Sequence, residues 1–558
     1  MKSRISFCDS TVLKKNLTRF APAWVLYGVF WLLLLVIMLD SNGSGKWFAY
    51  SMAESLTFTA VFNFCYAFLC TQLLFGDLYN SRMCNAQHAM PLRRETWFFT
   101  HVISGLIFSF GPNVLVMLLS SVFMENAFVV APLWLLIVTL QFLFFFGVAV
   151  FSAYCVGNRF AMGLVYLIIN FLSMILFWLL DNLYVPQLYG IRIDETPFTW
   201  FCPVFYMVSE PTVDLSFSEF NQLTAIFLEA GFWYTLLCAG IGLVFMALAL
   251  LLYRKRNLES AGDFMAIRAF NPVFLLLYCL CVGTVCYLFF SLSIGEENLF
   301  FLLVGLIIGW FTGRMLLERT IRVFRLKSFL GCGALLLVFF CSLLLTRLDP
   351  IGITRWIPEA NAIKGVHITT GGSRYDYYTN GTNYLSDPAD IDAVLTLHHY
   401  GTTHRDANVN GKADVSITIR YELKTGIVAT RYYSVDTDTV EATVLENLMS
   451  RSNVVLGTEL TDGASIAESL VMIRTPQDKI LTGAEMEGLL DAILLDCAEG
   501  NLAQDWAFHA DENSLWLTLE WKTDKAYTHY REVRVYPSSV HTYAYLLEHG
   551  LIGAEDYK

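Results

Sequence analysis

The sequence predicts a polytopic α-helical membrane domain of about nine transmembrane helices, followed by a soluble α+β domain. Of the 558 residues, 56% are hydrophobic and only 15% are charged, and the mean hydropathy of +0.51 is far above that of soluble domains. Residues 1–349 carry 21 basic and 19 acidic side chains, whereas residues 350–558 carry 16 and 30. The acidic second part argues against nucleic acid as a partner, because phosphate backbones require clustered lysine and arginine.

Long apolar runs define the predicted spans. A hydrocarbon core about 30 Å thick needs about 20 mostly apolar residues per helix. The predicted spans are residues 21–39, 56–75, 97–123, 132–157, 160–180, 231–253, 272–294, 299–317 and 329–345. The eighth run is the weakest because Arg314 lies near its end. The first is expected to be retained, because its apolar stretch is long and no small-residue cleavage site follows directly.

The distribution of basic residues predicts the orientation in the plasma membrane. Eighteen lysines and arginines lie before the first span and in alternate loops, and the opposite loops hold only Lys46, Arg192 and Arg347. Basic side chains accumulate on the cytoplasmic side, so we expect a cytoplasmic amino terminus and, after nine crossings, an extracytoplasmic carboxyl-terminal domain. If the eighth run did not span, that domain would be cytoplasmic.

Two segments predicted to be cytoplasmic have helical apolar patterns. Before the first span, an apolar face at residues 13, 17 and 20 beside three cations predicts an interfacial helix, or alternatively only a basic topogenic flank. In the loop of residues 76–97, an apolar stripe recurs at helical spacing and Pro91 is expected to end the helix. The stripe consists of Tyr79, Met83, Ala86 and Met90. It needs a packing partner, either the spans of the chain itself or another subunit.

The order of these features resembles the membrane subunits of type-2, exporter-like ABC transporters. In that family an interfacial helix precedes the first span, and a cytoplasmic coupling helix between spans two and three ends in a Leu-Pro-x-x-Arg-like element. This chain has Met90-Pro91-Leu92-Arg93-Arg94 at that place. It is also similar to a permease group with extra spans and an outer carboxyl-terminal domain, to which the segment of residues 256–263 also belongs. The resemblance implies a six-span core in residues 1–260, three additional spans in 261–349 and an extracytoplasmic domain in 350–558.

The resemblance implies that the chain is the permease subunit of an ATP-driven transporter, an exporter by family, and is not itself an enzyme. ATP and Mg²⁺ would belong to a separate ABC ATPase subunit, because the nearest phosphate-loop fragment, residues 43–47, lacks the upstream glycine and the Ser/Thr hydroxyl. The resemblance also implies a homodimer or a second permease subunit as a partner, and the spans would be surrounded by membrane lipid. The expected ATPase contacts are Tyr79, Met83, Ala86 and Met90 by packing, and Arg82, Arg93 and Arg94 by polar contact. Pro91, which ends the helix, is counted with this coupling element. Topogenic charge is the alternative for the arginines.

Polar residues inside the spans allow two interpretations. Asn63, Gln72, Gln141 and Asn170 would line a passage or, as we favour, form hydrogen bonds between helices. No Asp or Glu lies mid-span, which argues against a secondary transporter driven by protons. The substrate is not indicated by any of these residues.

The predicted outer domain contains a repeated pattern. Strands at 415–423 and 427–435 followed by a helix at 439–449 are matched by strands at 514–521 and 527–535 and a helix at 540–548. A further helix is expected at 482–495. Cys202 and Cys497 are the two cysteines placed outside, and they could pair, although a domain of this size does not need a disulfide.

Two groups of metal-ligand residue types occur in this domain. The first group is His398, His399, His404 and Asp406. Of these, His398 and His399 are expected at the end of a helix that begins at Asp387-Pro388, where they would suit the helix dipole. Asp406, Asn408, Asn410 and Asp414 have the spacing of a calcium loop, but Ile417 stands where a bidentate carboxylate belongs. An Asn-Gly turn entering the next strand is the simpler interpretation. A membrane-anchored sensor or binding protein without a transport passage remains the alternative function.

Overall fold

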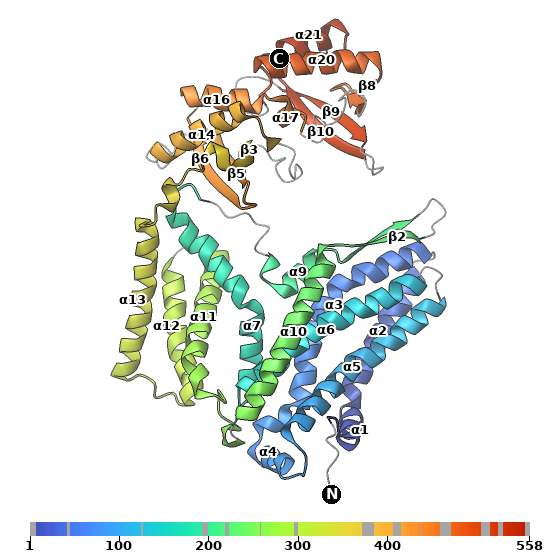
Figure 1. The fold of residues 1–558 in the computed structure, drawn as a ribbon, viewed down its shortest axis with the longest axis vertical. Helices are drawn as coiled ribbons and strands as arrows, with labels where there is room; N and C mark the ends of the chain where they lie inside the picture. Colours follow the sequence, from blue (N-terminus) through green and yellow to red (C-terminus); the bar gives the residue numbers. More distant parts are fainter. Residues whose placement is uncertain are drawn as a thin grey trace. The chain divides into compact units, whose positions relative to one another are not determined.

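The computed structural model describes residues 7–41, 45–123, 127–191, 199–217, 223–256, 258–294, 299–370, 384–404, 415–436, 438–457, 470–503, 514–522 and 528–552. The chain forms two compact units (Figure 1). The helical unit comprises residues 1–180 and 195–341, and the carboxyl-terminal unit comprises residues 181–194 and 342–558. Each unit therefore draws on two separate stretches of sequence.

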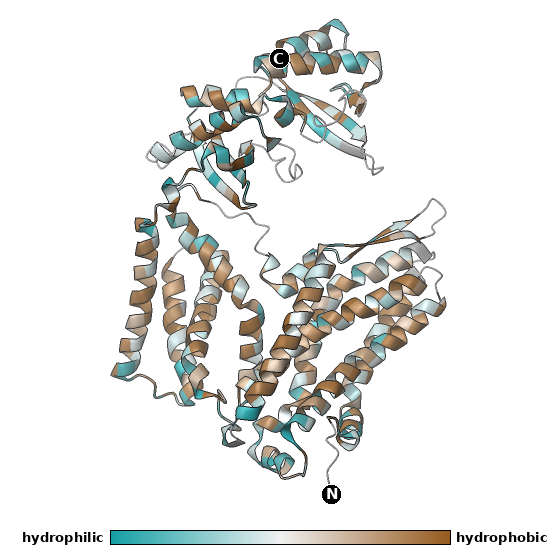
Figure 2. Cartoon of the chain, viewed as in Figure 1, coloured by the Kyte–Doolittle hydropathy of each residue, from teal (hydrophilic) through white to brown (hydrophobic). Residues whose placement is uncertain are grey.

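Within the described residues, nine helices are long and apolar enough to cross a membrane, which confirms the predicted number (Figure 2). They are α2 (Ala21–Ser41), α3 (Gly45–Leu74), α5 (Arg94–Phe123), α6 (Ala127–Cys155), α7 (Arg159–Leu179), α10 (Ala230–Lys255), α11 (Asn271–Ile294), α12 (Leu299–Glu318) and α13 (Leu326–Leu348). Most extend a few residues beyond the predicted apolar runs, because polar residues can occupy the first and last turns of a helix. The third, α5, contains Pro112 in its interior.

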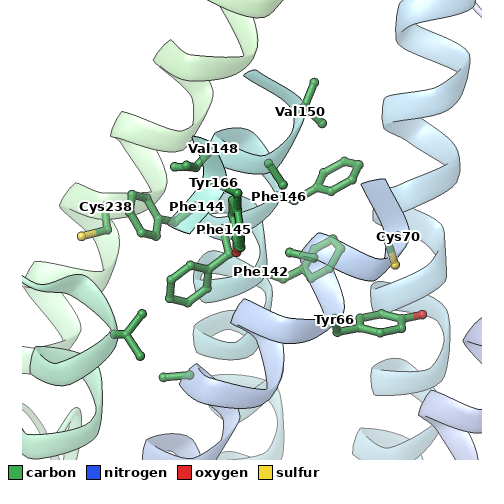
Figure 3. Packing of buried hydrophobic residues seen from close by; sticks show 14 of the residues in the cluster. Tyr66, Cys70, Phe142, Phe144, Phe145, Phe146, Val148, Val150, Tyr166 and Cys238 are labelled. Atoms are coloured by element: carbon green, nitrogen blue, oxygen red, sulfur yellow. The ribbon is translucent and has the colours of Figure 1, made fainter. Parts of the chain in front are cut away.

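The core of the helical unit is built around α6, the most buried of these helices. Its aromatic residues, including Phe142 and Phe145, meet side chains from α3, α7 and α10 (Figure 3). The helices α6 and α10 approach each other closely at Gly147 of α6 and Gly242 of α10. A Cβ on Gly147 would lie 2.2 Å from the Gly242 carbonyl oxygen. Small residues permit such close approach in helix bundles.

Buried amides in this core bond between helices. The Asn63 Nδ2 donates to the Val138 carbonyl oxygen, at 3.2 Å, and lies 3.3 Å from the Gln141 Oε1. Gln141 returns a bond to the Leu56 carbonyl oxygen, at 3.1 Å. Of the two interpretations of Asn63 and Gln141, these contacts agree with interhelical hydrogen bonding. Gln72 donates to the Arg159 carbonyl oxygen at the start of α7. Asn170 donates to the Tyr166 carbonyl oxygen within its own helix, so its bond is not between helices as expected.

Short elements lie at both ends of the helical unit. At one end are α1 (Ser10–Arg19), the 3₁₀ helix η1 (Gly76–Tyr79) and α4 (Ser81–His88); we call this the α4 end. The segment between α7 and α10 contains α9 (Pro203–Ser209) and an antiparallel hairpin of β1 (Val213–Phe217) and β2 (Leu223–Leu228). The hairpin packs on α3, where the Tyr50 hydroxyl donates to the Leu215 carbonyl oxygen, at 3.0 Å.

The carboxyl-terminal unit contains the same ββαββα order twice. The first copy is β3 (Ile363–Thr370), β4 (Tyr384–Leu385), α14 (Pro388–Thr403), β5 (Val415–Leu423), β6 (Val428–Val435) and α16 (Val440–Met449). The second is β7 (Leu470–Arg474), β8 (Ile480–Leu481), α20 (Ala484–Glu499), β9 (Leu515–Lys522), β10 (Thr528–Val535) and α21 (Val540–Glu548). Their antiparallel sheets have equivalent strand orders, β4-β3-β5-β6 and β8-β7-β9-β10, so the predicted hairpin-then-helix repeat is the second half of each copy.

A segment from between the fifth and sixth candidate spans packs on the first sheet. Tyr432 of β6 donates its backbone N–H to the Gly190 carbonyl oxygen, at 3.0 Å, and Ile191 forms a β-bridge with Arg431. The Tyr189 and Tyr433 rings lie 5.8 Å apart. Gly190 has a φ of +74°, and a Cβ there would lie 2.3 Å from the Tyr433 ring, so this contact requires glycine.

Candidate functional site

The loop between the second and third candidate spans folds into two short helices. The 3₁₀ helix η1 is followed by Asn80, whose side-chain oxygen accepts the backbone N–H groups of Arg82 and Met83, at 3.0 and 3.4 Å. This N-cap satisfies donors that a helix start leaves unpaired, and it fixes where α4 begins.

The expected continuous helix through the apolar stripe is therefore wrong at both ends. Tyr79 belongs to η1 and precedes α4. The α-helix ends at His88, so Met90 lies in the turn that leads to Pro91. Asn is among the residues most favoured at an N-cap and disfavoured inside a helix, so Asn80 was a usable signal for the start of α4 that the spacing of the apolar stripe obscured.

The outward face of α4 retains most of the predicted stripe. Met83 is 44% exposed and Met90 is 45% exposed, and Ala86 between them is also exposed. Arg82 and Arg93 are exposed beside them, as is Pro91. This arrangement offers an apolar centre with cations at its border, a composition suited to a protein partner. We call Arg82, Met83, Ala86, Met90 and Arg93 the α4 surface.

The opposite face of α4 is held by a buried imidazole. The His101 Nδ1 lies 3.1 Å from the Asn16 Nδ2 of α1, and its Nε2 lies 3.2 Å from the Gln87 Nε2 of α4. A neutral imidazole accepts on only one nitrogen. Turning the Gln87 amide over lets His101 donate to its oxygen, which otherwise has no partner in the described part of the chain. His101 then joins α1, α4 and α5.

A second histidine fixes the last turn of α4. The His88 Nδ1 lies 2.8 Å from the Cys84 carbonyl oxygen, and its Nε2 lies 2.9 Å from the Tyr253 hydroxyl of α10. The carbonyl can only accept, so Nδ1 carries the proton and the Tyr253 hydroxyl donates to Nε2. Cys84 is buried on the same face, and burial raises the pKa of its thiol. It is therefore a packing residue of α4 with a protonated thiol at neutral pH.

Two of the expected contact residues point into the protein. The Tyr79 hydroxyl is buried, and burial raises the pKa of Tyr79 above its usual value. The Arg94 Nη1 donates to the carbonyl oxygens of Tyr253, Arg254 and Arg256, at 3.1, 3.3 and 3.1 Å. These carbonyls lie at the end of α10, where helix geometry leaves acceptors without donors. Arg94 thus caps α10 and is not part of the α4 surface.

Arg256 makes a similar internal contact. The side chain is only 5% exposed, and it donates to the carbonyl oxygens of Ala153 and Leu78, at 3.2 and 3.3 Å. Burial lowers the pKa of its guanidinium, although an arginine stays charged at neutral pH. One side chain thereby ties the ends of α10, α6 and η1 together.

The chain after α10 is clamped to the end of α6. Ala266 donates its N–H to the Cys155 carbonyl oxygen at 2.9 Å, and Gly262 to that of Gly157 at 2.7 Å. A Cβ on Gly157 would lie 2.1 Å from the Ser260 carbonyl oxygen. Asp263 forms an ion pair with Arg319 beyond α12, at 3.2 Å. The α4 end of the core is thus linked to the three additional helices.

Sequence reasoning missed His101, Gln87 and the capping role of Arg94. A usable signal was a histidine one turn inside a predicted span, since buried imidazoles in membrane helices need polar partners. The partners themselves could not be identified, because Asn16 and His101 lie in different helices.

The metal-ligand candidates of the carboxyl-terminal unit divide in two. Asp406, Asn408, Asn410 and Asp414 lie outside the described residues. His398 is not at a helix end as expected, because α14 continues to Thr403; it is fully buried, with its Nδ1 3.0 Å from the Tyr421 hydroxyl. Burial first, and then the charges of Arg431 and His399, lower the pKa of His398 to about 4.

Cys202 and Cys497 are both buried as free thiols.

Comparisons with protein-family models, with curated proteins and with solved structures found no match to this chain.

Proposed function

We propose that this chain is the permease subunit of an ATP-driven transporter of the exporter-like ABC type, and that a separate ATPase subunit docks on the α4 surface. The observation that carries the proposal is the two-sided character of α4. Met83 and Ala86 on its outward face and Met90 in the following turn are exposed, whereas its inner face is fixed by hydrogen bonds through His101 and Tyr253.

Rigid attachment is what a coupling element requires. A force on a loosely held loop would deform the loop, whereas a force on α4 acts on the helices bonded to it. Gln87 and His88 connect α4 to α5 and α10. ATP-dependent closure of a docked ATPase dimer would therefore shift the inner ends of several spans together, and this rigid-body shift would favour one access state over another.

The proposed orientation places α4 and the ATPase in the cytoplasm. The loops at the α4 end hold most of the basic residues of the helical unit, including Arg82, Arg93 and the cluster at 254–256. By the positive-inside tendency this is the cytoplasmic side of the plasma membrane. Nine crossings would then place residues 350–558 outside the cell, where they would receive or guide a substrate.

The ATP and Mg²⁺ of the cycle would be bound by the ATPase subunit. One chain offers one six-helix core, and transporters of the type it resembles contain two. We therefore expect a homodimer or a pair with a second permease chain.

A membrane-anchored sensor is the second candidate. The observation that favours it is the contact of residues 189–191 with β6. Through this contact, a ligand of the carboxyl-terminal unit would act on the segment that follows α7 without any transport passage. The two functions differ in whether an ATPase partner exists.

Affinity co-purification tests the proposal. The tagged full chain would be purified in mild detergent from its native membrane, beside a Met83→Asp/Met90→Asp variant. The matched control is Ile321→Asp, which changes a 77% exposed apolar residue in the loop after α12. Burying a methionine contributes about 1.5–3 kcal/mol, so the double variant should lose the ATPase at least about tenfold, while the control retains it.

Three outcomes are distinguishable once size-exclusion profiles show that all variants are folded. Loss of an ABC ATPase only from the double variant supports both the permease and its docking surface. Retention by the double variant would show that the ATPase docks elsewhere. Absence of any ATPase from the unmodified protein would favour the sensor.

A further inference from the structure

An apolar groove lies between α2 and α5 at the α4 end of the helical unit. Its volume is about 290 Å³. Trp24 and Leu32 of α2 and Ile107 and Leu115 of α5 line its sides, and Leu17 of α1 closes one end. Ile107 and Leu115 are 37% and 47% exposed, so the groove opens towards the surroundings of the helices.

Small residues create the groove. At Gly28 a Cβ would lie 3.3 Å from the Pro112 Cβ, so the two helices nearly touch there. At Gly111 nothing lies within 4 Å of the Cβ position. Because glycine has no side chain, this part of the groove stays open. Pro112 cannot donate to the Phe108 carbonyl oxygen one turn earlier, and the Tyr66 hydroxyl donates to it instead, at 3.1 Å. The α5 wall is therefore held in place from behind.

The length of the groove matches one leaflet. From Trp24 to Leu32, α2 rises about 12 Å at about 1.5 Å per residue. Half of a hydrocarbon core about 30 Å thick is about 15 Å. Trp24 lies at the junction of α1 and α2 and donates its Nε1–H to the Leu17 carbonyl oxygen, at 3.0 Å. An indole at a helix end typically marks the headgroup level, so the groove begins at the interface and runs inward.

Positive charge stands at the interfacial end. Helix α1 carries Lys14, Lys15 and Arg19 and no acidic residue. Lys14 is exposed and precedes Leu17 by three residues, which puts the two on neighbouring positions of the helix surface. Lysines near a bilayer surface attract anionic headgroups.

We propose that the groove binds one acyl chain of an anionic phospholipid, with the phosphate of the headgroup at Lys14. The chain would enter sideways from the membrane and cover Gly111. The headgroup would rest on α1, which His101 joins to α4. This lipid site does not depend on the ATPase partner.

The test uses lipids with a photoactivatable acyl chain. The purified full chain in nanodiscs would be labelled with phosphatidylglycerol or phosphatidylcholine bearing the same chain, and labelled peptides would be mapped by mass spectrometry. We expect label on α2 and α5 with about a fivefold preference for phosphatidylglycerol, the size of one lysine–anion attraction at a membrane surface. Lys14→Gln should remove that preference.

Filling the groove should abolish the label there. Gly111→Phe is the first variant, and Leu115→Trp fills the same space if the first does not fold. The matched control is Gly240→Phe in α10, where the Cβ position is equally open. Undiminished α2 and α5 labelling in a folded groove-filling variant would overturn the site. Equal labelling by the two lipids would overturn the anionic headgroup, and crosslinks joining two copies through α2 or α5 would identify a second chain as the occupant.

Discussion

At the residue scale, His101 shows how a single buried side chain can position a surface helix. Its ring contacts Asn16 on one side and Gln87 on the other, and all three residues are buried. Buried amides without partners are costly. The three groups therefore favour one arrangement of α1, α4 and α5, which would hold the α4 surface at a fixed height relative to the spans.

We predict that His101→Leu destabilises the protein by about 1–3 kcal/mol, because the buried Gln87 amide loses its partner, whereas the Asn16 amide keeps its bond to the Ser104 hydroxyl. His101→Gln, which keeps hydrogen-bonding groups, should cost less. Unfolding midpoints of the purified protein in detergent provide the comparison. A leucine variant as stable as the unmodified protein would show that the network does not fix α4.

His398 predicts a pH dependence of the carboxyl-terminal unit. Its folded-state pKa is lowered to about 4 from an unfolded value of about 6.5, so the unfolded chain binds the proton more readily. Stability is therefore full above about pH 6.5 and falls as the pH decreases towards about 4, by about 3 kcal/mol at most. Protection factors of the β5 and β6 amides in the full chain, which are corrected for the pH dependence of intrinsic exchange, should fall over this interval, and His398→Asn should flatten the dependence. An unchanged slope in that variant would assign it to other groups.

The sequence could identify the α4 surface only in part. Met83, Ala86 and Met90 followed from their spacing, and their exposure agrees with a docking role. Arg94 did not follow, because a topogenic arginine, a partner contact and a helix cap have the same local sequence. What distinguishes them is the position of the end of α10, which lies about 160 residues away in the chain.

At the element scale, the spans and the carboxyl-terminal hairpins were predictable because each is long and periodic. The strands β4 and β8 were not, since each has only two residues and is defined by its neighbour. The β1–β2 hairpin was missed although residues 213–217 alternate apolar and polar side chains, because it packs on α3 of the helical unit and not in a sheet of the predicted outer domain. The start of α4 was predicted too early, because the apolar stripe begins at Tyr79 whereas the Asn80 N-cap starts the helix at Ser81.

The clamp between α6 and the segment after α10 gives an element-scale prediction. Gly157→Ala would press a Cβ against a backbone oxygen that cannot move aside, at 2.1 Å, and should destabilise the protein by about 1–3 kcal/mol. Gly240→Ala is the control: its Cβ meets open space, and alanine favours the helix. Thermal unfolding in detergent distinguishes the two. Equal midpoints for both variants would mean that the clamp yields without cost.

At the scale of the whole molecule, the carboxyl-terminal unit is assembled from two distant parts of the sequence. Residues 181–194 follow α7 directly, and residues 342–558 begin within α13. The composition of the sequence predicted a domain boundary near residue 350, but it could not show that residues 181–194 belong to the same unit. Only the short stretch around Gly190 joins the sheet, and so few residues carry no pattern that is typical of a domain.

We predict that Gly190→Ala detaches this segment from β6. The substitution combines a left-handed φ of +74° with a Cβ that meets the Tyr433 ring. Amide exchange in peptides covering Tyr432 should increase. Gly426→Ala, at a φ of +82° with open space around its Cβ, carries the backbone strain of about 1 kcal/mol without the clash. Equal exchange at Tyr432 in both variants would attribute the effect to strain alone.

The contact of residues 189–191 also protects β6 from unwanted pairing. In the order β4-β3-β5-β6, β6 is an edge strand, and Tyr432 and Arg431 meet Gly190 and Ile191 there. Uncovered edges invite strand addition and aggregation. A fragment that begins at residue 350 would leave this edge bare and should self-associate, whereas the same fragment joined to residues 181–194 should stay monomeric.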